Sequence, residues 1–429
     1  MKKILAAINI FLLAGLACMA QVNAELDRMI TGHHEVAGLT VCPYELNPAF
    51  GDFTDTKAPK GYKPVYISHY GRHGSRSSWD RETYGKLISI LEQAKEAGVL
   101  SASGDSLLHE TRLILEATAG MDGRLTYRGQ REHRGIASRM YRRYRGVFRN
   151  GSRYVRVLSS EVPRCLVSMA AFTGELSRLD PSLSFNMDCG SEIQKMVDNG
   201  ASNEANTIRR TVLDSLRSAM DPDLEPMMKR LFTDTDAAEK IVDSPLYLSR
   251  YIYYTARIAP SFDFDFDTYR FLDDELICLW SEHTNLSIYL GQCNSELLGD
   301  DRMPRTEPMI GNIVAFADEA LAIGNVAADL RFGHDYPLLA LCSRIGLEGV
   351  GERYSVDEAR RNFITTLYSP FAGNLQMIFY KGRKSSDPVL VKFLVNEKES
   401  SIPALESVEG PYYEWDKVKE HLQSTKISK

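Results

Sequence analysis

The sequence predicts an α/β fold, with a mostly parallel central sheet flanked by helices and an inserted α-helical cap domain. Short strand-like apolar runs at 65–68, 155–158 and 327–332 are each followed by a helical pattern. By contrast, residues 180–304 show helical stretches broken by Asp, Pro, Ser and Gly turns, with few strand signals. Strand–helix alternation at both ends of the chain, around a helical middle, indicates a core domain interrupted by an insertion.

The expected elements can be placed in order along the chain. The strands are rich in β-branched and aromatic residues and lie at 65–68, 155–158, 327–332, 375–380 and 389–395. The core helices show apolar residues at three- and four-residue spacing and lie at 80–97, 104–119, 127–148, 308–322, 337–345 and 413–422. Another helix begins at Pro163, because the fixed φ of proline suits a first turn. We therefore place the core at 45–178 and 305–429 and the cap at 179–304.

Composition excludes several classes of protein. Of the 429 residues, 51 are Lys or Arg and 57 are Asp or Glu, and the formal charge is −6. Charged residues make up 25% and hydrophobic residues 44%. These values exclude a disordered chain, a collagen, a coiled coil and a multi-span membrane protein, and the length is ample for a large core. The mild acidity argues against general nucleic-acid binding.

The first 20 residues predict a secretory signal peptide. Two lysines precede an apolar segment, 4–16, that is too short to span a bilayer. Small residues follow and suit cleavage after Ala20 or Ala24. Cys18 raises a lipoprotein alternative, which is disfavoured because the residue three positions before it is Gly where a lipobox usually carries Leu. We expect a periplasmic or secreted protein.

Six cysteines follow the signal: Cys42, Cys165, Cys189, Cys278, Cys293 and Cys342. An oxidising compartment permits disulfides, and the sequence leaves many pairings open. Cys165 and Cys342 fall among apolar residues of expected helices, where buried thiols are equally compatible. A local bridge between Cys278 and Cys293 is the pairing we favour. Because no CxxC or Cys/His cluster has zinc-site spacing, no metal is expected.

The first segment that carries chemistry follows the strand at 65–68 and reads Arg72-His73-Gly74-Ser75-Arg76. In open α/β sheets, loops at the carboxyl ends of strands bind ligands. Two arginines match the geometry of phosphate oxygens, and Gly74 lets the backbone come close to a ligand. A neutral His73 ring between them can attack phosphorus and form a phosphohistidine. A solvated surface loop is the alternative interpretation.

The second segment is His334-Asp335, which follows the strand at 327–332. An adjacent His and Asp at a strand end can supply a cation for the transferring phosphoryl group and an acid for the leaving alkoxide. Alone the pair is a weak signal, since Asp335 could simply cap a helix. It gains weight from the first segment, because both follow strands.

The third segment reads Ser159-Ser160-Glu161-Val162-Pro163-Arg164 and follows the strand at 155–158. Arg164 lies opposite the apolar stripe of the helix that begins here. It can direct a third guanidinium to the same phosphate, whereas an exposed helix arginine is the simpler interpretation.

Together these segments resemble the branch-2 histidine phosphatases, the histidine acid phosphatases and phytases that include the multiple inositol polyphosphate phosphatases. The resemblance spans roughly 64–345 and rests on Arg72-His73-Gly74-x-Arg76, Leu125-Thr126-x-x-Gly129, Ser159-Ser160 with Arg164, and His334-Asp335. Near the end, Asn374-Leu375 and Val395-Asn396-Glu397 look like the inositol polyphosphate phosphatase members.

The resemblance implies a metal-free enzyme with an α/β core and a helical cap. It makes His73 the nucleophile, Arg72, Arg76 and Arg164 the phosphate ligands, His334 the residue that stabilises the transition state, and Asp335 the proton donor. The sequence departs from the family pattern in ways that concern substrate rather than reaction. His334-Asp335 is the acid-phosphatase form, whereas inositol polyphosphate phosphatases usually carry His-Ala-Glu, and Tyr336-Pro337 replaces the Thr-Asn of many bacterial phytases. Ser78 stands where many members carry Pro or Thr.

One segment is strongly basic. Residues 124–164 contain twelve arginines against two glutamates. Apolar residues at helical spacing from Ile136 to Phe148 mark a buried stripe, so most of these arginines lie on other faces. One interpretation is a solvated basic face. The other is that arginines near the start of the helix line the pocket mouth and attract a polyanion such as phytate. Nucleic acid is disfavoured because aromatic residues are not interleaved for stacking.

The residues and the resemblance together predict an exported histidine-type phosphomonoesterase that acts through a phosphohistidine on phytate or other inositol polyphosphates. The expected partner is a small, polyanionic phosphomonoester, with no nucleic acid, membrane span or cofactor, and no oligomeric state is predicted. A broad-specificity acid phosphatase or sugar phosphatase is the alternative. A mutase of the phosphoglycerate mutase type is disfavoured by export and by the helical insert. A binding protein that has lost catalysis is disfavoured by the intact His73 and Asp335.

Overall fold

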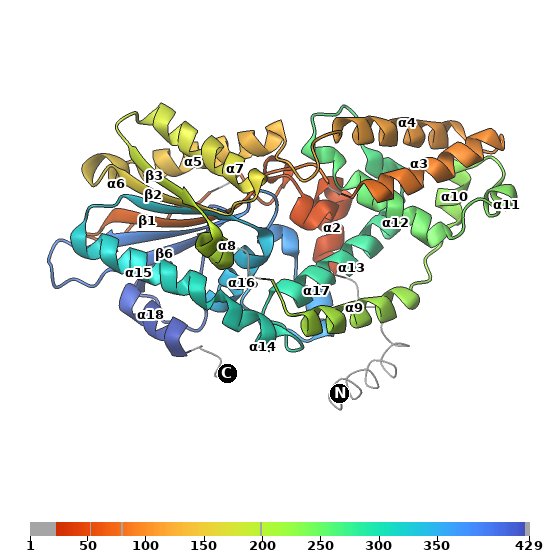
Figure 1. Ribbon diagram of the computed structural model, residues 1–429. Coiled ribbons are helices and arrows are strands. Elements are labelled where there is room, and N and C mark those ends of the chain that lie inside the picture. Colours follow the sequence, from red (N-terminus) through yellow and green to blue (C-terminus); the bar gives the residue numbers. More distant parts are fainter. Residues whose placement is uncertain (1–22, 52, 79, 198–199, 425–429) are drawn as a thin grey trace.

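The computed structural model describes residues 23–51, 53–78, 80–197 and 200–424. Its centre is an eight-stranded sheet with the order β3-β2-β4-β1-β5-β6-β7 and with β8 paired to β6 (Figure 1). The strands are β1 (Lys63–Arg72), β2 (Tyr154–Ser159), β3 (Ser184–Cys189), β4 (Ala328–Gly333), β5 (Asn374–Lys381), β6 (Leu390–Val395), β7 (Lys398–Ser400) and β8 (Tyr413–Glu414). Pairing is parallel from β3 to β1 and antiparallel from β1 onward. The predicted α/β fold class is confirmed, with a sheet that is parallel over half its strands.

Helices cover both faces of this sheet (Figure 1). One face carries α5 (Tyr127–Arg143), α6 (Arg145–Asn150) and α7 (Pro163–Leu179), whose apolar side chains pack on inward residues of β1, β2 and β4. The other face carries α15 (Glu307–Ile323), α16 (Asp335–Ile345) and α18 (Trp415–Ser424). Successive side chains of a strand point to opposite faces of the sheet. Ile67 therefore packs in the core under α5 and α7, and Tyr66 in the core under α15 and α18.

A helical part lies beside the sheet (Figure 1). It is built around α13 (Asp274–Gln292) and includes α2 (Ala24–Gly32), α9 (Asn203–Ser218), α10 (Glu225–Leu231), α11 (Thr235–Ala238), α12 (Pro245–Ala256), α14 (Gly299–Arg302) and α17 (Val356–Asn362). Helices α3 (Arg81–Glu96) and α4 (Ala102–Ala117), which precede the insertion in the chain, pack on α12 and α10 in this part. The boundary at 179 stays a prediction, and the helical part draws on sequence from both sides of it.

The structure differs from the expected elements in two places. Residues 184–189, expected within the helical cap, form the edge strand β3 beside β2. This strand is mostly exposed, so it lacks the apolar alternation that reveals a half-buried strand. The expected helix at 127–148 is interrupted at Tyr144, whose ψ of 35° leaves the helical range, so α5 and α6 are separate. Helix α8 (Ser191–Val197) follows β3.

The favoured bridge between Cys278 and Cys293 is wrong. Both are free thiols, as are the four other cysteines within the described residues. Cys278 lies near the start of α13 and Cys293 just after its end, so the helix itself holds them about 22 Å apart. Cys165 and Cys342 are fully buried thiols, as their apolar surroundings allowed. The signal peptide predicted for residues 1–20 lies outside the described residues, and no described helix is long and apolar enough to cross a bilayer.

Candidate active site

The carboxyl ends of three neighbouring parallel strands bring the predicted site residues together. β1 ends at Arg72 opposite Gly333, the last residue of β4, and β2 ends beside them at Ser159. The His73 amide donates to the Gly333 carbonyl at 2.9 Å and so ties the first loop to the second. All six candidates lie at this edge: His73, Asp335, His334, Arg72, Arg76 and Arg164.

His73 is 2% exposed, and its own loop holds its ring. Nδ1 lies 3.0 Å from the Gly74 carbonyl oxygen, which can only accept a hydrogen bond. Nδ1 therefore carries the proton, and Nε2 keeps the lone pair. Burial lowers the pKa of His73 well below its usual value, and the guanidiniums of Arg72 and Arg164 lower it further. The ring is neutral in the free protein, which is the form a nucleophile needs.

Two guanidiniums of the same loop lie over one aromatic ring. The Cζ atoms of Arg72 and Arg76 are 4.8 and 5.9 Å from the ring centroid of Phe371. Arg72 also donates to the carbonyls of Thr40 and, at 3.0 Å, Ser369. Burial lowers the pKa of Arg72, and it lowers that of Arg76 to about 9, with repulsion between the clustered cations adding to the effect. Because a bound anion relieves that repulsion, the cluster suits phosphate.

His334 lies between Arg164 and Ser160. Arg164 Nη2 is 3.1 Å from His334 Nδ1, and since a guanidinium only donates, Nδ1 accepts and Nε2 carries the proton. Nε2 lies 3.2 Å from Ser160 Oγ, to which it donates. Burial lowers the pKa of His334 to about 3, and Arg164 contributes, so the cation expected from the sequence is absent in the free protein. The rings of His73 and His334 lie close together, with centroids 5.7 Å apart and planes at 74°.

Asp335 is the first residue of α16 and places its Oδ2 3.7 Å from Arg72 Nη2. Burial raises the pKa of Asp335, but the guanidiniums of Arg72 and Arg76 outweigh burial, so that the pKa is lowered overall. The carboxylate is therefore ionised in the free protein. A dianionic phosphate among the same guanidiniums would offset their charge and raise this pKa, which allows Asp335 to hold a proton once substrate is bound.

Glu132 of α5 supports the catalytic loop, and the sequence reasoning missed this role. It is 1% exposed and accepts hydrogen bonds from the Ser75 amide (2.7 Å), the Ser75 hydroxyl (2.8 Å) and the Tyr44 amide (2.8 Å). Burial raises the pKa of Glu132 to about 7 despite these bonds. A signal was present, because Glu132 lies four residues before Ile136 on the buried stripe of its helix, where an acidic residue needs partners. Phe371 gave no such signal, since it lies in a loop outside any motif.

The arginines of the basic segment have partners within the fold. Two at the start of α5, Arg128 and Arg131, bind Asp263, each at 2.9 Å. Others pair farther along the segment: Arg139 with Glu397, Arg143 with Asp55, and Arg156 with Asp329 and Glu319. Of the twelve, Arg164 reaches the candidate active site. The arginines that form these pairs therefore brace the fold, and only part of their charge is available to a ligand.

Within the described ranges, His, Cys, Asp and Glu side chains form no group of three or more that could hold a metal ion. The site instead gathers nitrogen donors, a neutral imidazole and one carboxylate. That arrangement can bind a phosphate dianion, attack it with Nε2 of His73 and exchange a proton with its ester oxygen through Asp335.

Comparison with known proteins agrees with this geometry. No protein-family model matches the chain, and no curated protein matches it. Solved structures do match. The apo form of the multiple inositol polyphosphate phosphatase of Bifidobacterium longum has a TM-score of 0.70 at 17% identity, over 86% of this chain and 94% of that one. The phytase of D. castellii has a TM-score of 0.64 at 14% identity, over 91% and 85% of the two chains. A Hafnia alvei phytase has a TM-score of 0.53 at 10% identity, over 86% and 98%.

The protein therefore has the fold of the phytases and inositol polyphosphate phosphatases, an α/β sheet with a helical part at its side. The resemblance to branch-2 histidine phosphatases, predicted from four short motifs, is confirmed in the fold. These likenesses are below 25% identity, so they establish the architecture, and the chemistry rests on the residues of this chain.

Proposed function

We propose that this protein is an exported histidine-type phosphomonoesterase that works through a phosphohistidine intermediate. The observation that carries the proposal is the neutral His73 ring, whose Nδ1 faces the Gly74 carbonyl at 3.0 Å while Arg72 and Arg76 gather around the same loop. Nucleophile, anion ligands and a nearby carboxyl group are the parts that phosphoryl transfer requires. The fold shared with phosphatases supports the same conclusion.

In the first step, Nε2 of His73 attacks phosphorus while the guanidiniums of Arg72, Arg76 and Arg164 hold the non-bridging oxygens. The ester P–O bond breaks, and the leaving alkoxide takes the proton of Asp335. In the second step, water attacks the phosphohistidine and gives its proton to the Asp335 carboxylate. The P–N bond breaks, its electron pair returns to the imidazole, and inorganic phosphate leaves.

His334 assists as a neutral group. It stacks against Tyr336, with parallel rings and centroids 5.5 Å apart, and its hydrogen bonds to Arg164 and Ser160 fix its orientation. By orienting Arg164, it helps to place the third guanidinium on the phosphoryl group. Because Asp335 must be protonated in the first step, turnover should fall as the pH rises from mildly acidic to alkaline values.

Two candidate substrate classes follow from different observations. Inositol polyphosphates such as phytate follow from the fold, since the Bifidobacterium longum protein is an inositol polyphosphate phosphatase crystallised with inositol hexasulfate. Phosphomonoesters of lower charge, as for a broad-specificity acid or sugar phosphatase, follow from the arginines of 124–164 that are already paired with carboxylates. A phosphate-release panel of phytate, sugar phosphates and nucleotides separates the two.

The His73→Ala variant tests the proposal. It should lose turnover of every phosphomonoester in the panel, and acid-labile phosphohistidine should be trapped by quenching the wild-type reaction but not that of the variant. His109→Ala, on the outer surface of α4, is the matched control and should behave as wild type. Retained turnover in His73→Ala contradicts the nucleophile assignment. A wild-type protein that binds phosphate esters without hydrolysing them would instead support the binding-protein alternative.

A further inference from the structure

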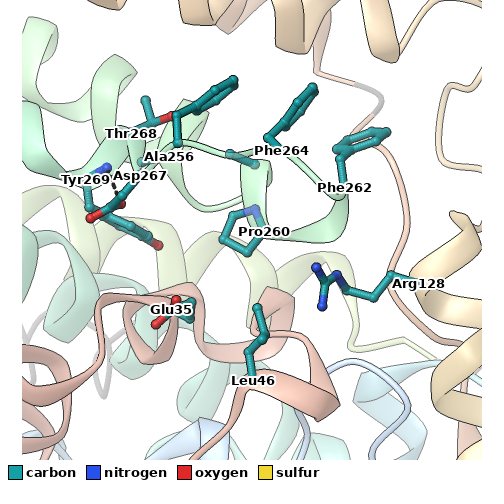
Figure 2. A pocket seen from close by; sticks show the side chains of 12 residues that line it. Glu35, Leu46, Arg128, Ala256, Pro260, Phe262, Phe264, Asp267, Thr268 and Tyr269 are labelled. Atoms are coloured by element: carbon teal, nitrogen blue, oxygen red, sulfur yellow. Dashed lines mark hydrogen bonds between the residues drawn. The ribbon is translucent and has the colours of Figure 1, made fainter.

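Figure 2 shows a pocket lined by residues of the helical part, of the segment before β1 and of helix α5. Its empty volume, which includes space open to solvent, is about 460 Å³. Its apolar wall comes from Leu46, Pro260, Phe262, Phe264, Phe266 and Tyr269, and we call it the aromatic pocket. The six candidate catalytic residues do not line it.

Three structural connections link the aromatic pocket to the catalytic loop. Arg128, which points into the pocket in Figure 2, directly precedes Gly129, whose backbone packs against Gly74. Glu35, another lining residue, belongs to the turn of 3-10 helix 34–41, which also supplies the carbonyl that Arg72 binds.

The third connection is a small apolar cluster. It includes Phe371, Ala259, Phe264 and Phe266, and the ring of Phe371 is the one that lies beneath the two guanidiniums of the catalytic loop. The floor of the phosphate site and the wall of the aromatic pocket are therefore parts of one packed layer.

The aromatic wall is ordered before any ligand binds. Phe264 and Phe266 stack with centroids 4.7 Å apart, and Phe262 lies 5.5 Å from Phe264. All three rings are only partly buried. Three neighbouring phenylalanines left partly exposed on one loop are costly in water, and such clusters mark binding sites.

Acidic residues that alternate with these phenylalanines fasten the loop. Asp263 binds Arg128 and Arg131, each at 2.9 Å, and Asp267 binds His34 at 3.2 Å. These ion pairs hold in place the loop that carries the three phenylalanines.

The charge of the pocket disfavours a polyanion. Among the described residues that line it, the single cation is Arg128, which is already engaged by Asp263 at 2.9 Å and Glu45 at 3.6 Å. Two carboxylates, Glu35 and Asp267, also line the pocket. A highly phosphorylated ring would meet carboxylates here, whereas an uncharged ring would bury apolar surface against the phenylalanines.

We propose that the aromatic pocket binds the leaving group of the phosphomonoester and selects alcohols that carry an uncharged aromatic or apolar ring over polyanionic ones. This inference rests on the proposed phosphomonoesterase function, and it favours the less charged of the two substrate classes. A ring packed against the phenylalanine side chains should raise kcat/KM by about tenfold.

The test compares phenylalkyl phosphates, with one to three methylene groups, with the alkyl phosphates of the same chain length. Each pair releases alcohols of similar acidity, so the difference reports binding of the ring. In the wild type, at least one phenylalkyl ester should exceed its alkyl partner by about tenfold in kcat/KM, and phytate should fall below it. Phe264→Ala should bring the ratio of kcat/KM between each phenylalkyl ester and its alkyl partner close to one, and this ratio separates lost ring binding from any general loss of turnover. Phe185→Ala, a partly buried phenylalanine on the edge strand β3, is the matched control.

Failures of the two proposals are distinguishable. If alkyl phosphates are hydrolysed but the phenyl ring brings no advantage, or if the advantage survives Phe264→Ala, the pocket assignment is wrong and the phosphatase stands. Phytate turned over with the highest kcat/KM overturns the selection against polyanions. If the wild type hydrolyses none of these esters, both proposals fail.

Discussion

Replacing Gly74 with alanine measures how closely the catalytic loop must approach helix α5. A Cβ on Gly74 would lie 2.5 Å from the carbonyl oxygen of Gly129, 2.7 Å from its Cα and 2.9 Å from its carbonyl carbon. Ordinary van der Waals contacts begin at 3.4 Å, so the distance between the new Cβ and the Gly129 carbonyl oxygen must increase by about 0.9 Å. The obstacle is the backbone of a helix rather than a flexible side chain. The loop itself must therefore move.

The expected cost follows from what that movement disturbs. The Gly74 amide donates to Ser168 Oγ at 3.2 Å, and the next amide, that of Ser75, donates to the buried Glu132 carboxylate at 2.7 Å. Overpacking costs about 1–3 kcal/mol, and weakening a buried hydrogen bond costs about 0.5–1.5 kcal/mol. Since His73 is the neighbouring residue, displacement of roughly 1 Å should lower kcat about a hundredfold.

The assay is kcat with saturating p-nitrophenyl phosphate, together with thermal unfolding. Gly174→Ala on α7 is the matched control, because its Cβ would have no heavy atom within 4 Å. That variant should keep the wild-type kcat, and its stability should rise by about 0.5–1 kcal/mol because alanine favours the helix. A Gly74→Ala protein with kcat within about threefold of wild type and an unchanged Tm would refute this account of the loop.

Three other predictions test the supports of the site. Glu132→Gln puts an NH2 donor where the Ser75 amide needs an acceptor, so kcat should fall at least roughly tenfold; wild-type kcat would show that the carboxylate is dispensable. Burial lowers the pKa of His69 and His133 to about 3, so below pH 6.5 the unfolded chain binds more protons than the folded one. Stability should therefore fall from pH 6.5 toward pH 3, by about 2–3 kcal/mol per histidine at pH 4.5. Urea unfolding at pH 7 and 4.5 measures this, and His133→Gln should show a weaker pH dependence; an equal dependence would contradict it. Asn23 is buried, caps α2 and donates to the Phe363 carbonyl at 3.1 Å, so the proposed signal cleavage should leave it in the mature protein; N-terminal sequencing checks this, and a chain starting after it would contradict the prediction.

Elements with a strong local pattern were predictable from the sequence. β1, β2 and β4 are buried on at least one face, and their apolar runs identified them, as did those of the antiparallel pair β5 and β6. The edge strand β3 escaped detection because its place in the sheet comes from pairing with β2, and its exposed side chains carry no apolar alternation. A local apolar pattern indicates which segments are buried. Where a strand is mostly exposed, only its pairing with a neighbouring strand identifies it.

The roles of the six candidate site residues stay predictions, but their convergence was expected from the sequence, since they lie at or after the ends of β1, β2 and β4 and the carboxyl ends of neighbouring parallel strands meet at one edge. Their protonation states were not. His334 was expected to be a cation and is neutral, because its pKa depends on burial and on Arg164, which is 170 positions away in the sequence. The residue types in the sequence indicate which reactions the site could catalyse. The charge that each side chain carries depends on neighbours that folding brings close to it.

By itself, then, this sequence indicated the reaction chemistry that we propose, through an Arg-His-Gly-x-Arg loop and a His-Asp pair, each placed at the end of a strand. Tertiary structure alone decided which arginines are available to a ligand, because the carboxylates that bind Arg128, Arg139 and Arg143 come from distant segments. It also decided where the aromatic pocket lies, since Phe262, Phe264 and Phe266 reach the site only when the helical part packs beside the sheet. Contacts between residues far apart in the chain leave no local signature, and so the sequence alone predicts neither the ion pairs of these arginines nor this pocket.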